Sequence, residues 1–255
     1  MRAPPVILFS GIKRSGKDTA ATLLALELER LCFGLRTDIK GFATPLKELI
    51  NRVFPFLPYN ALHGSDSEKE AHLSWQESSF SGVEFRQELT GLLQEPGLRV
   101  DMICKAFEER VMAMRAVARI EGDRLICPGC SGRKLAQQIG TEIFRNMIDD
   151  NFWVNLAIAE IADQAHLPFP TTSIFTDARF PQEIETGVFA TAPLIFVKGR
   201  GGTGDSHSSE AMVSDPGFPD RVLARPHGYV VDNSGTLDDL RAQMKTIAQK
   251  LTEQA

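Results

Sequence analysis

The sequence predicts an α/β protein in which helices cover both faces of a parallel sheet of five strands. Five short runs of apolar or β-branched residues have the length of buried strands, and helical patterns lie between most of them. Strands that alternate with helices favour a parallel sheet with both faces covered. The 255 residues are 43% hydrophobic and 24% charged, which is enough apolar material for a sizeable core.

The elements follow in order along the chain. The first helix is expected over Asp18–Leu31, which is rich in Ala, Leu and Glu, with Gly34 beyond it as a C-cap. The last helix is expected from about Thr236 to Leu251, where "TLDD" forms a capping box with Asp in place of Glu. The five strands are expected at 5–10, 35–42, 171–177, 193–199 and 228–233.

Residues 60–132 break this alternation of strands and helices. The run "VDMICKAFEERVMAMRAVARI" has a helical pattern and lies between polar stretches, so this region is expected to be a mostly helical excursion from the sheet. We expect one domain over 1–255, with a core at 1–50 and 133–255 and an excursion at about 51–132. The Gly-rich stretch at 198–210 predicts a flexible loop, and a lid-like loop is expected at about 199–215.

The charge and the hydropathy pattern exclude several classes of partner. A formal net charge of -5 argues against a surface built for nucleic-acid backbones, whose affinity comes from Lys and Arg. No run approaches the about 20 apolar residues of a membrane span, and the N-terminus has no secretory signal. We therefore expect a soluble, cytoplasmic protein that binds neither nucleic acid nor a membrane.

The four cysteines give only one recognisable spacing, "CPGC" at 127–130. A single C-x-x-C without a second pair of ligands is a weak zinc signal. The sequence favours a turn with two thiols that stay reduced in the cytosol.

The segment "VILFSGIKRSGKDTAA" at 6–21 predicts a phosphate-binding loop. Its apolar strand, its glycines and the helix that starts at Lys17 direct backbone N–H groups and the positive helix end at one point. The common loop is G-x-x-x-x-G-K-[ST], and here Asp18 replaces the hydroxyl residue that ligates magnesium. Mg²⁺ prefers hard oxygen ligands, so a carboxylate there is compatible with a metal–nucleotide complex.

Each loop residue has an expected role in binding a nucleotide. Lys17 would reach the β- and γ-phosphates, Thr19 would offer its hydroxyl to an inner phosphate, and Lys13 and Arg14 would add charge for a phosphoryl group in transfer. The expected nucleotide-binding residues are Gly11, Lys13, Arg14, Ser15, Gly16, Lys17, Asp18 and Thr19.

Five segments in the same order carry a resemblance to a known family. They are "GIKRSGKDTAA", "RKLAQQIGTEIFRNMIDDNFWVNL" (133–156), "IFTDARFPQEIE" (174–185), "GDSHSSEA" (204–211) and "VVDNSGTLDDL" (230–240). Together they resemble the deoxynucleoside monophosphate kinases of tailed bacteriophages. The match runs from the first strand to the last helix and is thin across 50–132.

The resemblance implies a phosphate-loop kinase fold, with a five-stranded parallel sheet, a helical part that binds the nucleoside monophosphate, and a short lid. It implies transfer of the γ-phosphoryl group of ATP, with Mg²⁺, to a deoxynucleoside monophosphate, so the expected partner is a small nucleotide. A phage-encoded enzyme would work in the host cytoplasm, and a homodimer is compatible with the family.

Phosphoryl transfer needs alignment and positive charge, so the catalytic candidates are Lys17, Arg14 and Arg179. Arg179 and Asp177 follow a strand end, where ligands bind in open α/β sheets. Asp177 could hold magnesium, orient Arg179 or contact the substrate, so Asp18 and Asp177 are the metal candidates. The resemblance gives Glu183 a nucleotide contact, and the alternative is an acid in a helix first turn.

The remaining substrate candidates lie in or near the excursion. Arg133 and Gln137 are four apart and share a helix face, which suits a phosphate and a base edge. Gly140 and Thr141 would let backbone and hydroxyl approach the ligand.

Trp153 matches a substrate-contacting aromatic of the phage family, but a core Trp is equally compatible with "NFWVNLAIAEI". Lys47 and Lys69 are candidate contacts to the acceptor phosphate, with an exposed charged face as the alternative for Lys69. His207 and Glu210 match a family signature without a physical role.

Two other functions stay open at this point. Animal phosphomevalonate kinases share part of the pattern, and their acceptor needs cations and an apolar wall rather than an aromatic face with amides. A non-catalytic nucleotide-binding protein, such as a switch or an accessory to DNA modification, is the third alternative.

Overall fold

A computed structural model describes residues 2–54, 57–75, 82–93, 98–121, 124–201 and 211–253, which fall into two compact units. The first unit comprises Met1–Phe42 and Trp153–Ala255, and the second comprises Ala43–Phe152. The second unit extends further at both ends than the excursion expected at about 51–132.

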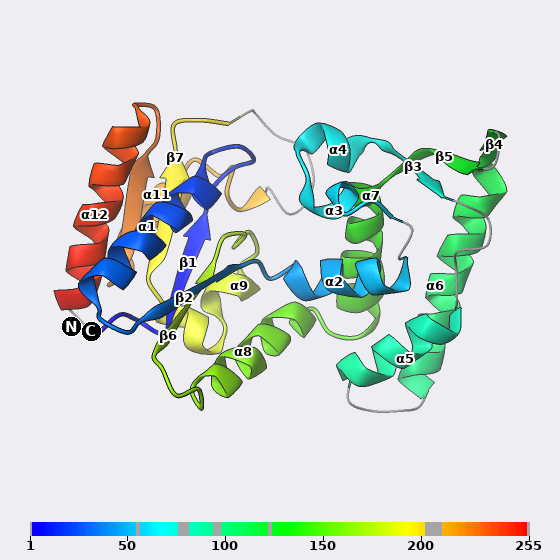
Figure 1. Cartoon of the computed structure of the whole chain (residues 1–255), viewed down its shortest axis with the longest axis horizontal. Coiled ribbons are helices and arrows are strands. Elements are labelled where there is room, and N and C mark those ends of the chain that lie inside the picture. Colours follow the sequence, from blue (N-terminus) through cyan, green and yellow to red (C-terminus); the bar gives the residue numbers. More distant parts are fainter. Residues whose placement is uncertain are drawn as a thin grey trace. The chain divides into compact units, whose positions relative to one another are not determined.

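The first unit is built on a parallel sheet with the strand order β2-β6-β1-β7-β8 (Figure 1). The central strand β1 pairs with β6 through Leu8 and Phe175 and with β7 through Leu8 and Leu194. The predicted five-stranded parallel sheet is therefore confirmed. The strands are β1 (Val6–Ser10), β2 (Arg36–Lys40), β6 (Thr171–Phe175), β7 (Leu194–Lys198) and β8 (Gly228–Asp232).

Two apolar clusters cover the two faces of this sheet, because successive strand residues point to opposite sides. Ile7 and Phe9 of β1 pack with α1 and α12, which lie side by side (Figure 1). Val6 and Leu8 pack on the opposite face with side chains of α8, η2 and α11. The helices of this unit are α1 (Lys17–Leu31), α8 (Phe152–Gln164), α9 (Gln182–Glu185), the 3-10 turn η2 (Gly187–Ala190), α11 (Phe218–Leu223) and α12 (Leu237–Glu253).

The predicted end of α1 and the predicted start of α12 both have the local structure that the sequence indicates. Gly34, beyond α1, has a left-handed backbone with φ of 78°. The predicted capping box before α12 forms, since Thr236 N donates to Asp239 Oδ2 at 2.8 Å and Asp239 N donates to Thr236 Oγ at 3.2 Å.

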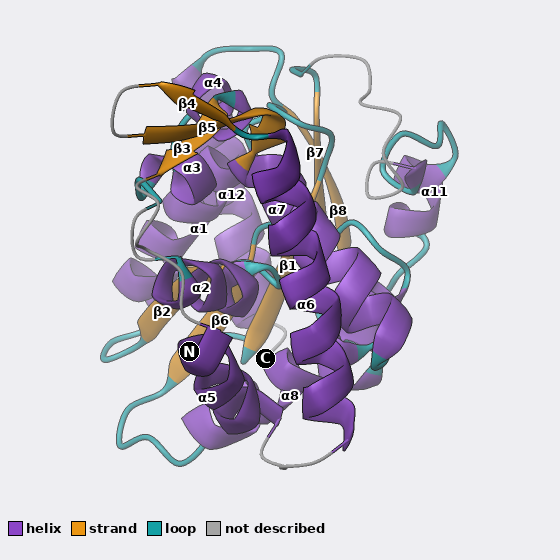
Figure 2. Ribbon diagram, turned by 90° about the vertical axis from the view of Figure 1, so that its right-hand side faces the viewer, coloured by secondary structure: helices purple, strands orange, loops and turns teal. Residues whose placement is uncertain are grey.

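The second unit contains helices together with a small antiparallel sheet in the order β3-β5-β4 (Figure 2). The expectation of a mostly helical excursion missed this sheet, whose short strands depend on cross-strand pairing rather than on local pattern. Its elements are α2 (Thr44–Val53), α3 (Asn60–His63), α4 (Asp66–Glu70), β3 (His72–Trp75), α5 (Gly82–Leu93), α6 (Leu98–Val117), β4 (Arg119–Glu121), β5 (Arg124–Ser131), α7 (Gly132–Gln137) and the π-helix η1 (Gln138–Arg145).

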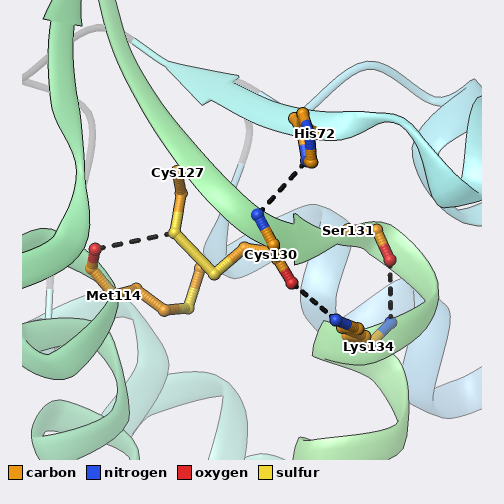
Figure 3. Close-up of a disulfide and its surroundings, with 7 residues drawn as sticks. His72, Met114, Cys127, Cys130, Ser131 and Lys134 are labelled. Carbon is orange, nitrogen blue, oxygen red and sulfur yellow. Dashed lines mark hydrogen bonds between the residues drawn. A yellow bond between two sulfur atoms is a disulfide. The ribbon is translucent and has the colours of Figure 1, made fainter.

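Cys127 and Cys130 form a disulfide in β5, so the expectation of two reduced thiols is wrong (Figure 3). Their Cα atoms lie 5.5 Å apart, within the range that a disulfide requires. The backbone between them is held on both sides, because Gly129 N donates to His72 Nδ1 at 3.3 Å and Lys134 Nζ donates to Gly129 O at 2.9 Å.

Among the described residues, no helix is long and apolar enough to cross a membrane.

Candidate functional site

The loop between β1 and α1 has the backbone of an anion-binding turn. Gly16 has φ of 89° and Arg14 has φ of 66°, both in the left-handed region. A Cβ at Gly11 would lie 2.6 Å from both Ser15 Oγ and Val197 O, so only glycine fits there. The loop therefore folds back tightly on the end of β1.

The N-terminus of α1 closes this loop. The N-cap residue is Gly16, which has no side chain to accept a hydrogen bond from the N–H groups of the first turn. Lys17 is 6% exposed, and Ser15 Oγ is buried with no hydrogen-bond partner among the described residues. Backbone amides, a buried cation and a buried hydroxyl thus gather at the positive helix end, which suits a phosphate.

The other loop residues lie nearer the surface. Lys13 is half-buried, and Arg14, Asp18 and Thr19 are exposed. Asp18 stands in the first turn of α1, where an acid is favourable toward the helix dipole.

Asp177 and Arg179 lie at the same edge of the sheet as the loop. Ala178, between them, is bonded to the end of β1 twice: Ser10 Oγ donates to Ala178 O at 2.7 Å and Ala178 N donates to Phe9 O at 3.1 Å. Asp177 Oδ1 also accepts from Phe42 N at 2.7 Å, so this carboxylate fixes the turn after β2. The carboxyl ends of three neighbouring strands are thereby tied together, as the sequence predicts for a ligand edge.

Glu183 is buried, 2% exposed, beneath the segment that carries Arg179. Its Oε2 accepts from the backbone N–H groups of Arg179 at 2.8 Å and Phe180 at 3.1 Å. Glu183 therefore orders the backbone of Arg179, a contact that the sequence reasoning did not foresee. Its nucleotide contact stays a prediction.

In the second unit, Lys47 of α2 and Lys69 of α4 both lie near His63. Burial lowers the pKa of His63 below its ordinary value, and the charges of Lys47 and Lys69 lower it further. The ring of His63 stacks on Tyr59, with 4.2 Å between centroids, and its Nε2 lies 3.0 Å from Asn51 Nδ2. The charges of both predicted phosphate contacts thus act on one imidazole, and Lys69 is half-buried rather than on a fully exposed face.

Arg133 and its neighbours lie on α7 and the π-helix that follows. Arg133 Nε pairs with Glu70 Oε1 at 2.7 Å, next to Lys69 in the chain. Gln137 and Thr141 are half-buried. π-helical turns are often found at functional sites, which is in keeping with the roles expected for this block.

Two residues predicted to contact the substrate, Gly140 and Trp153, are buried by packing in the structure. Gly140 is buried, and a Cβ there would overlap the side chain of Leu46 in α2, so this glycine serves helix packing. Trp153 is 4% exposed, which favours the core alternative, and base stacking by Trp153 stays a prediction. His207 and Glu210, with most of the expected lid, lie outside the described residues.

The sequence reasoning missed one residue at the sheet edge. Asn233, directly after β8, donates from Nδ2 to Ser15 O of the phosphate loop at 2.9 Å. Within the described ranges, no three His, Cys, Asp or Glu side chains cluster as a metal site would require.

The comparison with known proteins identifies the family of the chain. A model of the deoxynucleotide monophosphate kinase family matches residues 5–244. The chain belongs to this family. It is 28% identical over 251 residues to the deoxynucleotide monophosphate kinase of Escherichia phage RB69, across 95% of this chain and 98% of that protein. It is 24% identical over 259 residues to the deoxynucleotide monophosphate kinase of Enterobacteria phage T4, across 96% and 99%.

Membership of the deoxynucleotide monophosphate kinase family confirms three predictions. The resemblance to phage kinases, the phosphate-loop kinase fold and the assignment to the nucleotide kinases all hold. The roles of individual site residues stay predictions.

Proposed function

We propose that the chain transfers the γ-phosphoryl group of MgATP to the 5′-phosphate of a deoxynucleoside monophosphate. An oxygen of the acceptor phosphate forms the new bond to the γ-phosphorus, and the bond from that phosphorus to the β,γ-bridging oxygen breaks. The products are a deoxynucleoside diphosphate and ADP. The acceptor oxygen is already an anion at neutral pH, so no residue has to remove a proton.

The observation that carries this proposal is the loop from Gly11 to Thr19. Its left-handed Gly16, the first turn of α1 and the buried Lys17 support this proposal, in which they donate together to the β- and γ-phosphates. Arg14 and Arg179 are proposed to neutralise charge on the moving phosphoryl group. Lys13, Ser15 and Thr19 complete the set of phosphate contacts.

The chemistry of the acids fits a magnesium ion. The exposed carboxylate of Asp18 offers hard oxygen ligands in the first turn of α1, and nucleotide-bound Mg²⁺ takes one or two carboxylates beside phosphates and waters. Bound Mg²⁺ would neutralise charge on the phosphates. Asp177 is the second proposed ligand, and its Oδ1 also holds Phe42 N.

The acceptor is proposed to bind through the cations of the second unit. Lys47 and Lys69, whose charges both act on His63, are proposed to supply positive charge for the acceptor phosphate. Arg133 adds a guanidinium, which suits bidentate contact with a phosphate. Gln137 is proposed to read the base edge through its amide, with Gly140 and Thr141 beside it in the chain, and Glu183 acts by ordering Arg179.

The direct test measures ADP release in a coupled assay with each deoxynucleoside monophosphate and, separately, with mevalonate 5-phosphate. Turnover of at least one deoxynucleoside monophosphate is expected. Turnover of mevalonate 5-phosphate alone, or of no acceptor, would overturn the proposal.

A variant pair separates catalysis from folding. Lys17→Met should lower kcat/KM by about 10²–10³-fold, the cost of removing one donor to a developing negative charge. Lys245→Met alters an exposed lysine of α12 and should leave kcat/KM unchanged. Equal activity of the two variants would show that Lys17 has no catalytic role.

A further inference from the structure

The phosphate loop holds a backbone conformation that neighbouring residues must maintain. Arg14 is a non-glycine residue with φ of 66°, a conformation that costs free energy unless the surroundings enforce it. Inside the loop, Ser15 N donates to Ile12 O at 3.1 Å. The further restraint comes from a residue 218 positions away in the chain.

That residue is Asn233, which follows β8 and is 7% exposed. Its Nδ2 donates to Ser15 O at 2.9 Å in a buried hydrogen bond. A Cβ on Gly16 would overlap this same nitrogen, so the loop and the amide are packed against each other. Because a trans peptide is planar, anchoring Ser15 O also sets the direction of the N–H of Gly16, which points away from Asn233.

Asn233 is itself held at both backbone groups. Its N–H donates to Lys198 O at 2.8 Å, and its carbonyl accepts from Arg200 Nε at 2.7 Å. Arg200 also donates from its Nη2 to Gly235 O at 2.6 Å, so the guanidinium spans the turn that carries Asn233. The amide therefore reaches the loop from a backbone with little freedom to move.

The segment after β7 makes a second contact with the loop, besides that of Asn233. A Cβ on Gly201 would overlap Lys13 O, so backbone lies against backbone there. Gly201 has φ of 110°, which suits glycine. The contacts of Asn233 and Gly201 both come from the segments that follow β8 and β7. Both are made to carbonyl groups of the loop rather than to the N–H groups that a phosphate needs.

We propose that Asn233 is a positioning residue for the donor phosphates: it holds the Ser15–Gly16 peptide so that the amides at the start of α1 are aligned before nucleotide binds. The inference rests on the proposed use of MgATP. Asn233 acts through the loop and is not assigned a contact to the substrate. Arg200 keeps Asn233 in place.

The test uses Asn233→Ala and Asn233→Asp in the full chain. Alanine removes the donor, and aspartate keeps the shape but turns an oxygen toward Ser15 O. Each should lower kcat/KM for MgATP about tenfold, as expected for a buried carbonyl left without its donor. The KM for the deoxynucleoside monophosphate should change by less than about twofold, and the Kd for ADP, measured by calorimetry, should rise in step with the loss for MgATP.

The matched control is Thr236→Ala, which removes a capping hydrogen bond in the same connection between β8 and α12. It should lower the melting temperature while leaving the Kd for ADP unchanged. If both Asn233 variants bind ADP as the wild type does, the inference is wrong. A wild-type chain that binds ADP but phosphorylates no deoxynucleoside monophosphate would overturn the proposed function, while the ratio of ADP affinities would still test Asn233.

Discussion

At the residue scale, Asp18 is the position where this loop departs from the common phosphate loop. Its carboxylate is exposed in the first turn of α1, whereas the neighbouring Lys17 is buried. An acid there can stabilise the helix end and can also hold a hard cation. The two roles make different predictions for magnesium.

Asp18→Ala should raise the Mg²⁺ concentration for half-maximal activity about tenfold, the scale seen when a metal-supporting group is lost. The measurement is a magnesium titration of the coupled assay at saturating ATP. The control is Asp238→Ala, an exposed first-turn acid of α12. Wild-type magnesium dependence in Asp18→Ala would leave Asp18 with only its role at the helix end.

We expect His63 to make the stability of the protein depend on pH. Burial and the charges of Lys47 and Lys69 lower its pKa in the folded state, so the unfolded chain binds the proton more readily. This contribution to stability is present above the ordinary histidine pKa of about 6.5 and is lost as pH falls below it.

Urea unfolding of the wild type between pH 8 and pH 5 should therefore show a fall in stability below about pH 6.5 that is smaller in His63→Gln. His166→Gln removes an exposed histidine of the first unit and serves as the control. Identical pH profiles for wild type and His63→Gln would contradict the argument.

The residues of the phosphate loop could be predicted because they are contiguous, and a strand, two glycines and a helix start define their geometry. Asn233 could not be predicted, because its partner Ser15 is 218 positions away and only the strand register brings them together. Glu183 shows the same limit: its spacing suggests a helix first turn, and only the folded chain shows its carboxylate beneath Arg179.

At the element scale, the strands of the parallel sheet could be predicted from local apolar runs. The strands of the small sheet could not, because cross-strand pairing defines them. The strands β1, β6 and β7 are largely buried apolar runs, and the partly exposed edge strands β2 and β8 also stand out in the sequence as β-branched or apolar runs. The strands β3, β4 and β5 are short or contain Pro128 and Gly129, and their pairing shifts register between His72 and Leu73. Local pattern therefore favours a turn at "CPGC", whereas β5 continues through it, with Cys127 opposite Leu73, Ser131 opposite His72 and the register shift between them.

The disulfide in β5 makes a direct chemical prediction. Cys127 and Cys130 are bonded, and Cys32 and Cys104 are free and buried. Protein unfolded in urea without reductant should therefore take up two alkylating groups, on Cys32 and Cys104, and four after reduction. Mass spectrometry of the alkylated peptides counts them. Four groups without reductant would show that Cys127 and Cys130 are thiols, as the sequence alone suggested.

Arg225 ties the chain after α11 to the turn before β7. Its half-buried guanidinium donates to backbone carbonyls of that turn, and burial lowers its pKa. The accepting carbonyls belong to Ile184, Phe189, Ala190 and Ala192. Removing the guanidinium leaves these groups without a charged donor.

Arg225→Ala should destabilise the protein by about 2–3 kcal/mol, measured by urea unfolding, because charged hydrogen bonds to several carbonyls are lost. Arg221→Ala, in α11 itself, removes a surface ion pair with Asp215 and should cost less than about 1 kcal/mol. Equal losses for the two variants would mean that the four carbonyls find other partners.

At the scale of the whole molecule, the proposed ligand contacts divide between two units. The phosphate loop, Asp177 and Arg179 belong to the first unit, and Lys47, Lys69 and the block from Arg133 to Thr141 belong to the second. Each unit has its own sheet and helices, and under the proposed function each binds its own ligand. Hydrogen exchange can therefore assign each ligand to a unit, because bound groups protect the amides that they contact.

ADP alone should slow exchange in peptides covering Gly11–Thr19, since the first-turn amides of α1 would then donate to phosphate. A deoxynucleoside monophosphate alone should slow exchange in α2, α4 and α7, which carry the cations proposed for the acceptor. In Lys17→Met the protection by ADP should be lost while that by the monophosphate persists, because the two proposed sites share no residue of the loop. If the monophosphate protects only Gly11–Thr19, the second unit does not bind the acceptor, and Lys47, Lys69 and Arg133 serve the fold rather than the reaction.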